Sequence, residues 1–241
     1  DRNAVVEVRG LSQHTLGTYG TVALAGNDGR VLATHVGAKL SINGISNSSL
    51  YALHFGSYGG STVRWLYFAL GLAGAFLFYS GNLLWIESRR KRRHVDQPRR
   101  TRIMARATIG VCVGTCLGIS GAFAATLAAS HLGVDAAMPQ QLACYGLFLA
   151  ACAYAFTRPI PRAAIELLTA TAVLTIVVAV ADLFGNTAVW THAWAPGTAS
   201  VLGVDLTATV LGIAFACLAR AALRRARHGD ANSVWALPAP H

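Results

Sequence analysis

Charged residues are scarce in this sequence. Asp, Glu, Lys and Arg make up only 12% of the 241 residues, whereas 54% are hydrophobic and the mean hydropathy is +0.47. A soluble domain of this length would carry roughly 25% charged residues. Several apolar runs reach the roughly 20 residues that are needed to cross the hydrocarbon core of a bilayer. The composition therefore excludes an ordinary soluble domain and predicts an integral membrane protein.

Cysteine is absent from every segment that is polar enough to be soluble. All five cysteines lie inside apolar runs: Cys112, Cys116, Cys144, Cys152 and Cys217. This placement argues against a disulfide framework. The spacing of Cys112 and Cys116 would put both thiols on one helix face and could suggest a metal pair, but free buried cysteine most often serves as small apolar filler. We favour the filler interpretation.

Two further features are missing. No GxGxxG motif follows a predicted strand, so the sequence gives no support for a Rossmann or P-loop nucleotide site. The chain begins at Asp1 without methionine, and its start has neither the basic nor the apolar region of a signal peptide. Because the first residues are predicted to face outward, we expect a fragment or a processed chain whose targeting helices lie upstream.

Lysine and arginine are missing from the predicted outer loops, although the net charge is +10. Most basic residues fall in three segments at helix ends (89–106, 158–162 and 220–227). Threading the apolar runs through a membrane puts all three segments on one side, which is the positive-inside pattern. The charge therefore predicts orientation and contact with anionic lipid, and it does not indicate nucleic-acid binding.

The sequence predicts an all-α polytopic membrane protein with a small N-terminal periplasmic β segment. Residues 1–50 show β-branched alternation, with a hairpin in TVALAGNDGRVLATHV that turns at Asn27, Asp28 and Gly29. SINGISNSS (41–49) is predicted to be a loop. Five transmembrane helices are then expected, at about 63–86, 107–132, 140–156, 163–184 and 200–223. In the second of these, Gly110, Gly114 and Gly118 form a row of small residues that predicts close helix packing.

Three histidines are predicted at the outer membrane face, each on a different element. His54 precedes the first helix, His131 ends the second helix, and His192 lies in the last outer loop. Two neutral imidazoles from different helices at matched depth are what a six-coordinate haem iron requires. The alternative is that histidines are tolerated at this interface because one edge of the ring can stay hydrated.

Three acidic residues fall within the apolar runs, where a charge costs roughly 2.5–3.5 kcal/mol at a helix centre. Glu166 is expected near an inner end and to pair with Arg162. Asp182 and Asp205 are expected at similar outer depths on helices that are joined by the loop carrying His192. These two could orient a ligating imidazole through its second nitrogen, or relay protons. Snorkelling to the interface is an open alternative, more so for Asp182 than for the deeper Asp205.

The run LHFGSYGGSTVRWLYFALGLAGAFLFYSGNLLWIESRRKRR resembles the PepSY-associated transmembrane-helix family of bacterial inner-membrane proteins. The matching positions are Leu53, His54 and Gly56; Gly59 and Gly60; Gly71 and Leu72; Ser80 and Gly81; and Trp85 before the basic cluster 89–93. Serine replaces the usual threonine at Ser80. The upstream segment 21–36 is similar to the end of a PepSY periplasmic module. The resemblance is specific over about 20–93 and only general over the later helices.

This resemblance implies four parts: a periplasmic PepSY-like segment (1–52), the PepSY-associated helix with its basic flank (53–93), a four-helix membrane region (94–228) and a cytoplasmic tail (229–241). It also implies residence in the bacterial inner membrane and a role in iron and siderophore use. A b-type haem held by His54 would reduce a ferric siderophore at the periplasmic face, with electrons from a donor protein or the quinol pool. His131 as a second ligand follows from topology alone.

Two other functions remain open from the sequence. The PepSY-like segment could bind or restrain a partner, with the helices serving only as an anchor. The chain could also be a permease component for iron chelates that uses Asp182 and Asp205 as coupling groups.

Overall fold

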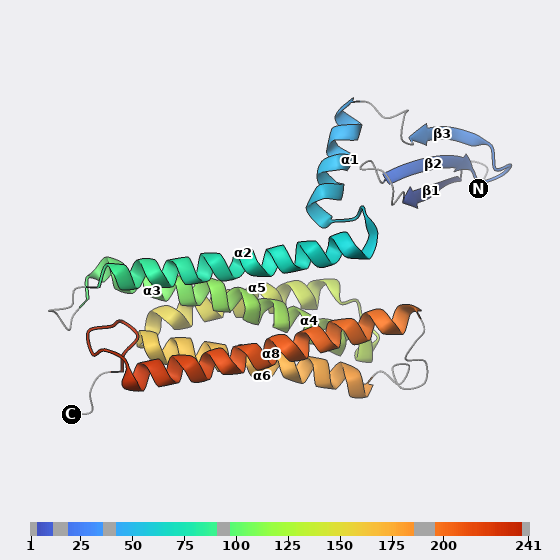
Figure 1. The fold of residues 1–241 in the computed structure, drawn as a ribbon. Helices are drawn as coiled ribbons and strands as arrows, with labels where there is room; N and C mark the ends of the chain where they lie inside the picture. Colours follow the sequence, from blue (N-terminus) through green and yellow to red (C-terminus); the bar gives the residue numbers. More distant parts are fainter. Residues whose placement is uncertain (1–3, 12–18, 36–41, 91–96, 186–195, 238–241) are drawn as a thin grey trace. The chain divides into compact units, whose positions relative to one another are not determined.

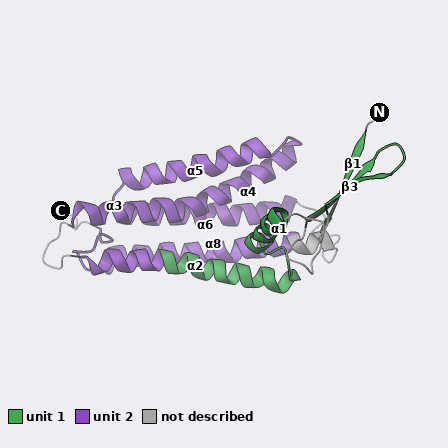
Figure 2. Ribbon diagram, turned by 90° about the horizontal axis from the view of Figure 1, so that it is seen from above, with its two compact units in different colours: residues 1–78 green, residues 79–241 purple. Residues whose placement is uncertain are grey.

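The computed structural model describes residues 4–11, 19–35, 42–90, 97–185 and 196–237. The chain separates into two compact units, residues 1–78 and residues 79–241, which are coloured separately in Figure 2. Each unit is described by itself below.

The first unit begins with a three-stranded antiparallel sheet of order β1-β2-β3, formed by β1 (Val5–Leu11), β2 (Tyr19–Ala25) and β3 (Val31–His35). Val8 pairs with Val22, and Ala23 pairs with Ala33. The β2–β3 hairpin turns where the sequence predicted. There, Gly29 has a φ of 70° and the Asp28 carboxylate accepts a 3.0 Å hydrogen bond from the Arg30 amide. Both strand segments and the hairpin are therefore confirmed.

The predicted loop at 41–49 is wrong, because these residues begin the helix α1 (Ile42–Phe55). Serine and asparagine lower helix propensity by only about 0.5–0.7 kcal/mol each, which is a weak preference. The segment that follows, Leu50–Phe55, contains good helix formers and extends the helix, and Ala52 on it is fully buried. The longer element therefore overrides the local preference of its polar first half.

The long helix α2 (Gly60–Ser88) follows and crosses the boundary between the two units. The second unit then contains α3 (Arg99–Thr108), a π-helical segment (Ile109–Val113), α4 (Gly114–Leu132), α5 (Ala137–Thr157), α6 (Ile160–Gly185) and α8 (Pro196–His228). Figure 1 shows α4, α5, α6 and α8 running alongside one another. All five predicted helices are present, and the second starts earlier than expected because the basic residues at 99–106 are helical.

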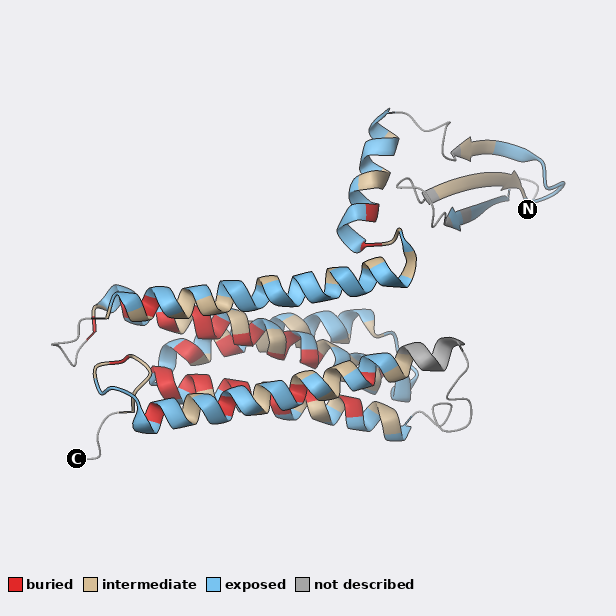
Figure 3. Ribbon diagram, in the orientation of Figure 1, coloured by how far each residue is buried: buried red, intermediate tan, exposed pale blue. Residues whose placement is uncertain are grey.

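The core of the second unit lies where these helices face one another. Figure 3 shows buried residues gathered on the inward faces of α3 to α6, with exposed residues on the outward faces. Ile109, Leu117, Leu167 and Leu168 are each 8% exposed or less. Most large apolar side chains on the outward faces are exposed, as expected where lipid and not water covers the protein.

Four helical stretches in the described residues are long and apolar enough to cross a membrane: Gly60–Ser88, Arg99–Leu132, Ile160–Gly185 and Val201–His228. The protein is therefore a multi-pass membrane protein, but the predicted count of five spans is not confirmed. The helix that falls short is α5. Its first turns contain Gln140 and Gln141, and its apolar part (142–156) is only about 22 Å long at about 1.5 Å per residue.

The row of glycines in the second unit packs against α5, as the sequence predicted. A Cβ added to Gly110 would lie 3.1 Å from the Cys152 backbone, and one added to Gly118 would lie 2.6 Å from the Cys144 carbonyl oxygen. The missing side chains therefore let the two backbones approach closely. α4 is also joined to α6, by a buried 2.7 Å hydrogen bond between the hydroxyls of Ser120 and Thr175.

The Arg-rich ends of α2, α3, α6 and α8 lie at one end of the second unit, which we call the basic end. Here the residues after α8 fold back onto the helices and do not extend as a free tail. Asp230 accepts a 2.7 Å hydrogen bond from Arg90, and the Asn232 carbonyl accepts one of 2.7 Å from buried Gln97. Trp235 packs against the core. The Asp230 contact raises the pKa of Arg90. This contact was not predicted from the amino-acid pattern.

At the basic end, two arginines and one serine contact the carboxylate of Glu87. It lies 3.0 Å from Arg90 and 3.4 Å from Arg225, and it accepts a 3.3 Å hydrogen bond from Ser233. Glu87→Gln is expected to lower the melting temperature, because two arginines lose a charged partner at once. Glu166→Gln is the matched control at the same end, since Glu166 has a single arginine at 3.9 Å. The native cysteines, all free, report unfolding through a thiol-reactive dye. Equal melting temperatures for the two variants would contradict a special role for Glu87.

Candidate functional site

His54, the first candidate ligand, lies in the last turn of α1. The sequence predicted only that it precedes the membrane helix, and the structure adds that a helix presents it. Its side chain is exposed, and its ring meets Phe55 edge-on at 4.9 Å between centroids. An exposed imidazole at a helix end is available to an external ligand.

The segment after His54 turns the chain from α1 into α2. Gly56 has a φ of 57°, and the Ser57 amide donates a 3.1 Å hydrogen bond to the Ala52 carbonyl, which is a glycine-terminated helix end. A Cβ on Gly56 would also lie 3.3 Å from the Tyr67 ring. The hydroxyls of Tyr58 and Tyr67 are 3.3 Å apart. The glycines therefore form a defined bend between α1 and α2. This bend sets the direction of α1, which carries His54, at the start of α2.

His131, the second candidate ligand, lies in the last turn of α4. Its ring is exposed and lies against the end of α6, since a Cβ added to Gly185 would be 3.1 Å from both Cε1 and Nε2 of His131. His192 lies outside the described residues. His54 and His131 belong to different units, so the structure does not place these two rings relative to each other.

Asp182 and Asp205 are brought together, as their predicted depths suggested. Asp182 is in the last turns of α6 and Asp205 is in the first half of α8, and the packing of Gly212 on Ile176 puts the two residues at the same level of these helices. Asp205 is only 8% exposed. Gly185, which contacts His131, is one turn beyond Asp182 on α6. The three predicted polar residues of the second unit therefore gather at the end opposite to the basic end.

Glu166 has a different partner from the one predicted. Its carboxylate accepts a 2.6 Å hydrogen bond from the Tyr154 hydroxyl and lies 3.9 Å from Arg158, whereas Arg162 was expected. Tyr154 and Arg158 are at the end of the neighbouring helix α5, so the tertiary contact replaces the local pair. The Arg158 guanidinium donates a 3.2 Å hydrogen bond to the Tyr154 hydroxyl, which raises the pKa of Arg158.

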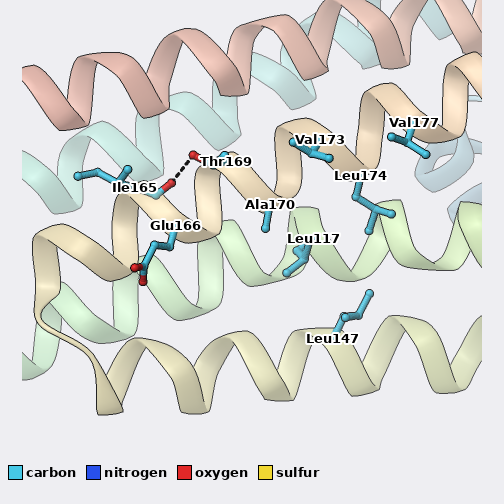
Figure 4. Close-up of a pocket in the computed structure, with 9 residues that line it drawn as sticks. All are labelled: Leu117, Leu147, Ile165, Glu166, Thr169, Ala170, Val173, Leu174 and Val177. Atoms are coloured by element: carbon cyan, nitrogen blue, oxygen red, sulfur yellow. Dashed lines mark hydrogen bonds between the residues drawn. The ribbon is translucent and has the colours of Figure 1, made fainter.

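Glu166 also marks one end of an open apolar groove of about 760 Å³ between α4, α5 and α6. Figure 4 shows Leu117 and Leu147 projecting into it from α4 and α5, opposite Leu174. In the part of the chain that the structure describes, no group of three or more His, Cys, Asp or Glu side chains is arranged to hold a metal ion.

Comparison with known protein families gives one match, over residues 13–88, to the family described as PepSY-associated TM region. Residues 13–88 are therefore similar to a PepSY-associated TM region. The family predicted from the His54–Trp85 pattern is thereby confirmed. The match covers β2, β3, α1 and α2, so both His54 and the Gly56–Gly60 bend lie inside the PepSY-associated region. No curated protein and no solved structure gives a significant match to the chain.

The fold-back at the basic end is a feature that sequence reasoning missed. A signal was present, because the residues after the last basic helix end include Val234, Trp235 and Leu237, which are unusual in a solvated tail. Half-buried Val234 and Trp235 contact the core, and the Leu237 amide donates a hydrogen bond to the Ala226 carbonyl. This feature lies outside the PepSY-associated region.

Proposed function

We propose that this protein serves iron acquisition in the bacterial inner membrane, as a haem-bearing electron carrier that reduces ferric siderophores at the periplasmic face. The observation that carries the proposal is the position of His54. It lies inside the PepSY-associated region, on the last turn of α1, with an exposed ring just before the first membrane helix. Such a residue can ligate a group at the membrane surface.

We propose that the group is a b-type haem with two imidazole ligands. The neutral imidazole of His54 would be one axial ligand, and His131, whose ring is exposed, or His192 would be the other. The His131 ring packs against Gly185, where a Cβ would lie only 3.1 Å from Cε1 and Nε2 of the ring. When bound, haem would supply the one-electron iron chemistry, while the protein would supply ligation and a surrounding of low polarity.

The orientation follows from charge. The basic end would face the cytoplasm, because arginine-rich segments remain there and the loops at 133–136 and 186–195 contain no lysine or arginine. Residues 1–60 would then be periplasmic. We also propose that α5 is a fifth crossing, because it packs antiparallel along α4 and must return the chain to the basic end, where α6 begins.

An absorption spectrum tests haem binding directly. The full-length protein, with any segment encoded before Asp1, would be purified in detergent from cells supplied with haem. We expect a Soret band and, after reduction with dithionite, a sharp α-band, because bis-imidazole iron is low-spin. A preparation that is correctly folded but shows no chromophore would contradict the proposal.

A binding module is a second candidate, which is favoured by the exposed apolar surface of the sheet. Val6 and Val8 lie on one face of β1 and are each 50% exposed. Exposed apolar patches often mark protein interaction sites. If the module interpretation holds, Val6→Lys with Val8→Lys abolishes siderophore-dependent growth, and the full-length protein shows no chromophore. If the carrier interpretation holds, the same variant keeps both the haem spectrum and growth.

A further inference from the structure

We propose that Asp182 and Asp205 form a proton-binding site within the membrane-spanning part of the protein, where the two carboxyl groups share one proton. This site does not depend on haem. It joins α6 to α8 at the end of the second unit opposite to the basic end.

The first support is the geometry of the pair. The helices α6 and α8 pack along their lengths, and a Cβ added to Gly212 would lie 2.5 Å from the Ile176 side chain. Asp205 is two turns before Gly212 and Asp182 is nearly two turns after Ile176, so the two carboxyl groups lie at the same level of this antiparallel pair. Asp205 is 8% exposed, and its Oδ2 has no hydrogen-bond partner among the described residues. An ionised carboxylate only accepts hydrogen bonds, so two ionised carboxylates cannot bond to each other. One proton between them turns a repulsive contact into a hydrogen bond.

The second support is the absence of a nearby positive charge on the described parts of α6 and α8 themselves. On α8 the first basic residue after Asp205 is Arg220, about 22 Å further along at about 1.5 Å per residue. On α6 the nearest is Arg162, at the basic end. Two negative charges without a cation inside a bilayer are strongly unfavourable. A proton removes one of them.

The other titratable groups near this end come from the helices that pack on α6. His131 on α4 contacts Gly185, and α5 carries Cys144 and Tyr145 in its first half. The carboxyls of Asp182 and Asp205 have no third His, Cys, Asp or Glu side chain beside them in the described residues, so a multidentate metal site is not assembled there. A proton needs only the two oxygens that the pair provides.

Protonation would control the contact between α6 and α8. With the proton bound, the pair holds the helix ends together. After its loss, two carboxylates repel each other at a point with low polarity, and the helix ends separate or admit water. The site would therefore couple proton uptake to the packing of α6 on α8.

Infrared spectroscopy of the full-length protein in lipid nanodiscs tests the site. At pH 6, an ordinary aspartate with a pKa of about 3.9 is ionised. We expect the wild type to show a carboxylic-acid carbonyl band at pH 6 that shifts in D₂O and disappears on alkaline titration. Asp205→Asn should remove this band. Asp182→Asn should move its disappearance to lower pH, because the like charge is gone. Asp135→Asn, in the exposed loop after α4, should change nothing.

Several results would overturn the proposal. One is a wild-type protein without a protonated carboxyl band at pH 6, and another is a band that persists in Asp205→Asn. If Asp205→Asn does not fold, a titration midpoint that Asp182→Asn leaves unchanged would overturn it. Loss of the band when sodium replaces a large organic cation at constant pH would also overturn it, because the ligand would then be a sodium ion.

Discussion

His54→Ala in the full-length protein is expected to remove the Soret and reduced α-bands, or to convert them to a high-spin spectrum. The imidazole of His54 is exposed at the end of α1, and alanine supplies no donor atom. The fold should persist, because the side chain of His54 is exposed on α1 and is not part of the buried core. The measurement is an absorption spectrum normalised to protein, with a circular dichroism spectrum as the folding check.

His228→Ala is the matched control for this experiment. His228 is also exposed and also ends a helix, but it lies at the basic end of α8. It should leave the haem spectrum unchanged. His131→Ala should alter the spectrum if His131 is the second ligand and should leave it intact if that ligand is His192 or another residue. A full low-spin spectrum in His54→Ala would show that His54 does not bind the iron.

Gly118→Leu is expected to destabilise the second unit by about 3 kcal/mol or more, because added bulk in a close-packed contact forces backbone shifts. The first added carbon would lie 2.6 Å from the Cys144 carbonyl oxygen and 3.4 Å from the Phe148 Cβ. Both belong to α5, so α4 and α5 must separate. The measurement is thermal unfolding in detergent, followed by the reaction of a dye with the five free cysteines.

Gly146→Leu is the control for that packing contact. Gly146 is on α5, and a Cβ there would meet nothing within 4 Å. Because leucine favours helix over glycine, this variant should melt at or above the wild-type temperature. Equal destabilisation by the two substitutions would contradict the α4–α5 contact.

The helices of the second unit were predictable because each apolar run is long and ends at a clear signal. The run from Ile160 to Gly185 is bounded by Pro159 and by the loop that begins at Asn186. The glycine row needs only helical spacing to predict a packing face. The hairpin was predictable because Asp28 and Gly29 have the chemistry of a tight turn. The family was predictable because His54, the glycine-rich bend and Trp85 form one continuous pattern.

Other features depend on tertiary contacts that no local pattern encodes. Glu166 pairs with Arg158 at the end of α5 and not with Arg162 in its own helix, because the Tyr154 hydroxyl on α5 donates a hydrogen bond to the Glu166 carboxylate. The residues after α8 looked like a solvated tail, but Arg90 and Gln97 offer them partners from distant parts of the chain. The approach of Asp182 to Asp205 was expected from depth, but their mutual contact required the packing of α6 on α8.

The reduction of a membrane-impermeant ferric siderophore tests the central claim most directly. Right-side-out membrane vesicles that contain the full-length protein would be supplied with a substrate that reduces the membrane quinone to quinol, and ferrous iron would be trapped outside by an impermeant chelator. We expect reduction that depends on the protein, is lost in His54→Ala and is retained in His228→Ala. Equal reduction rates in wild-type, His54→Ala and protein-free vesicles would contradict the role of the protein as an electron carrier.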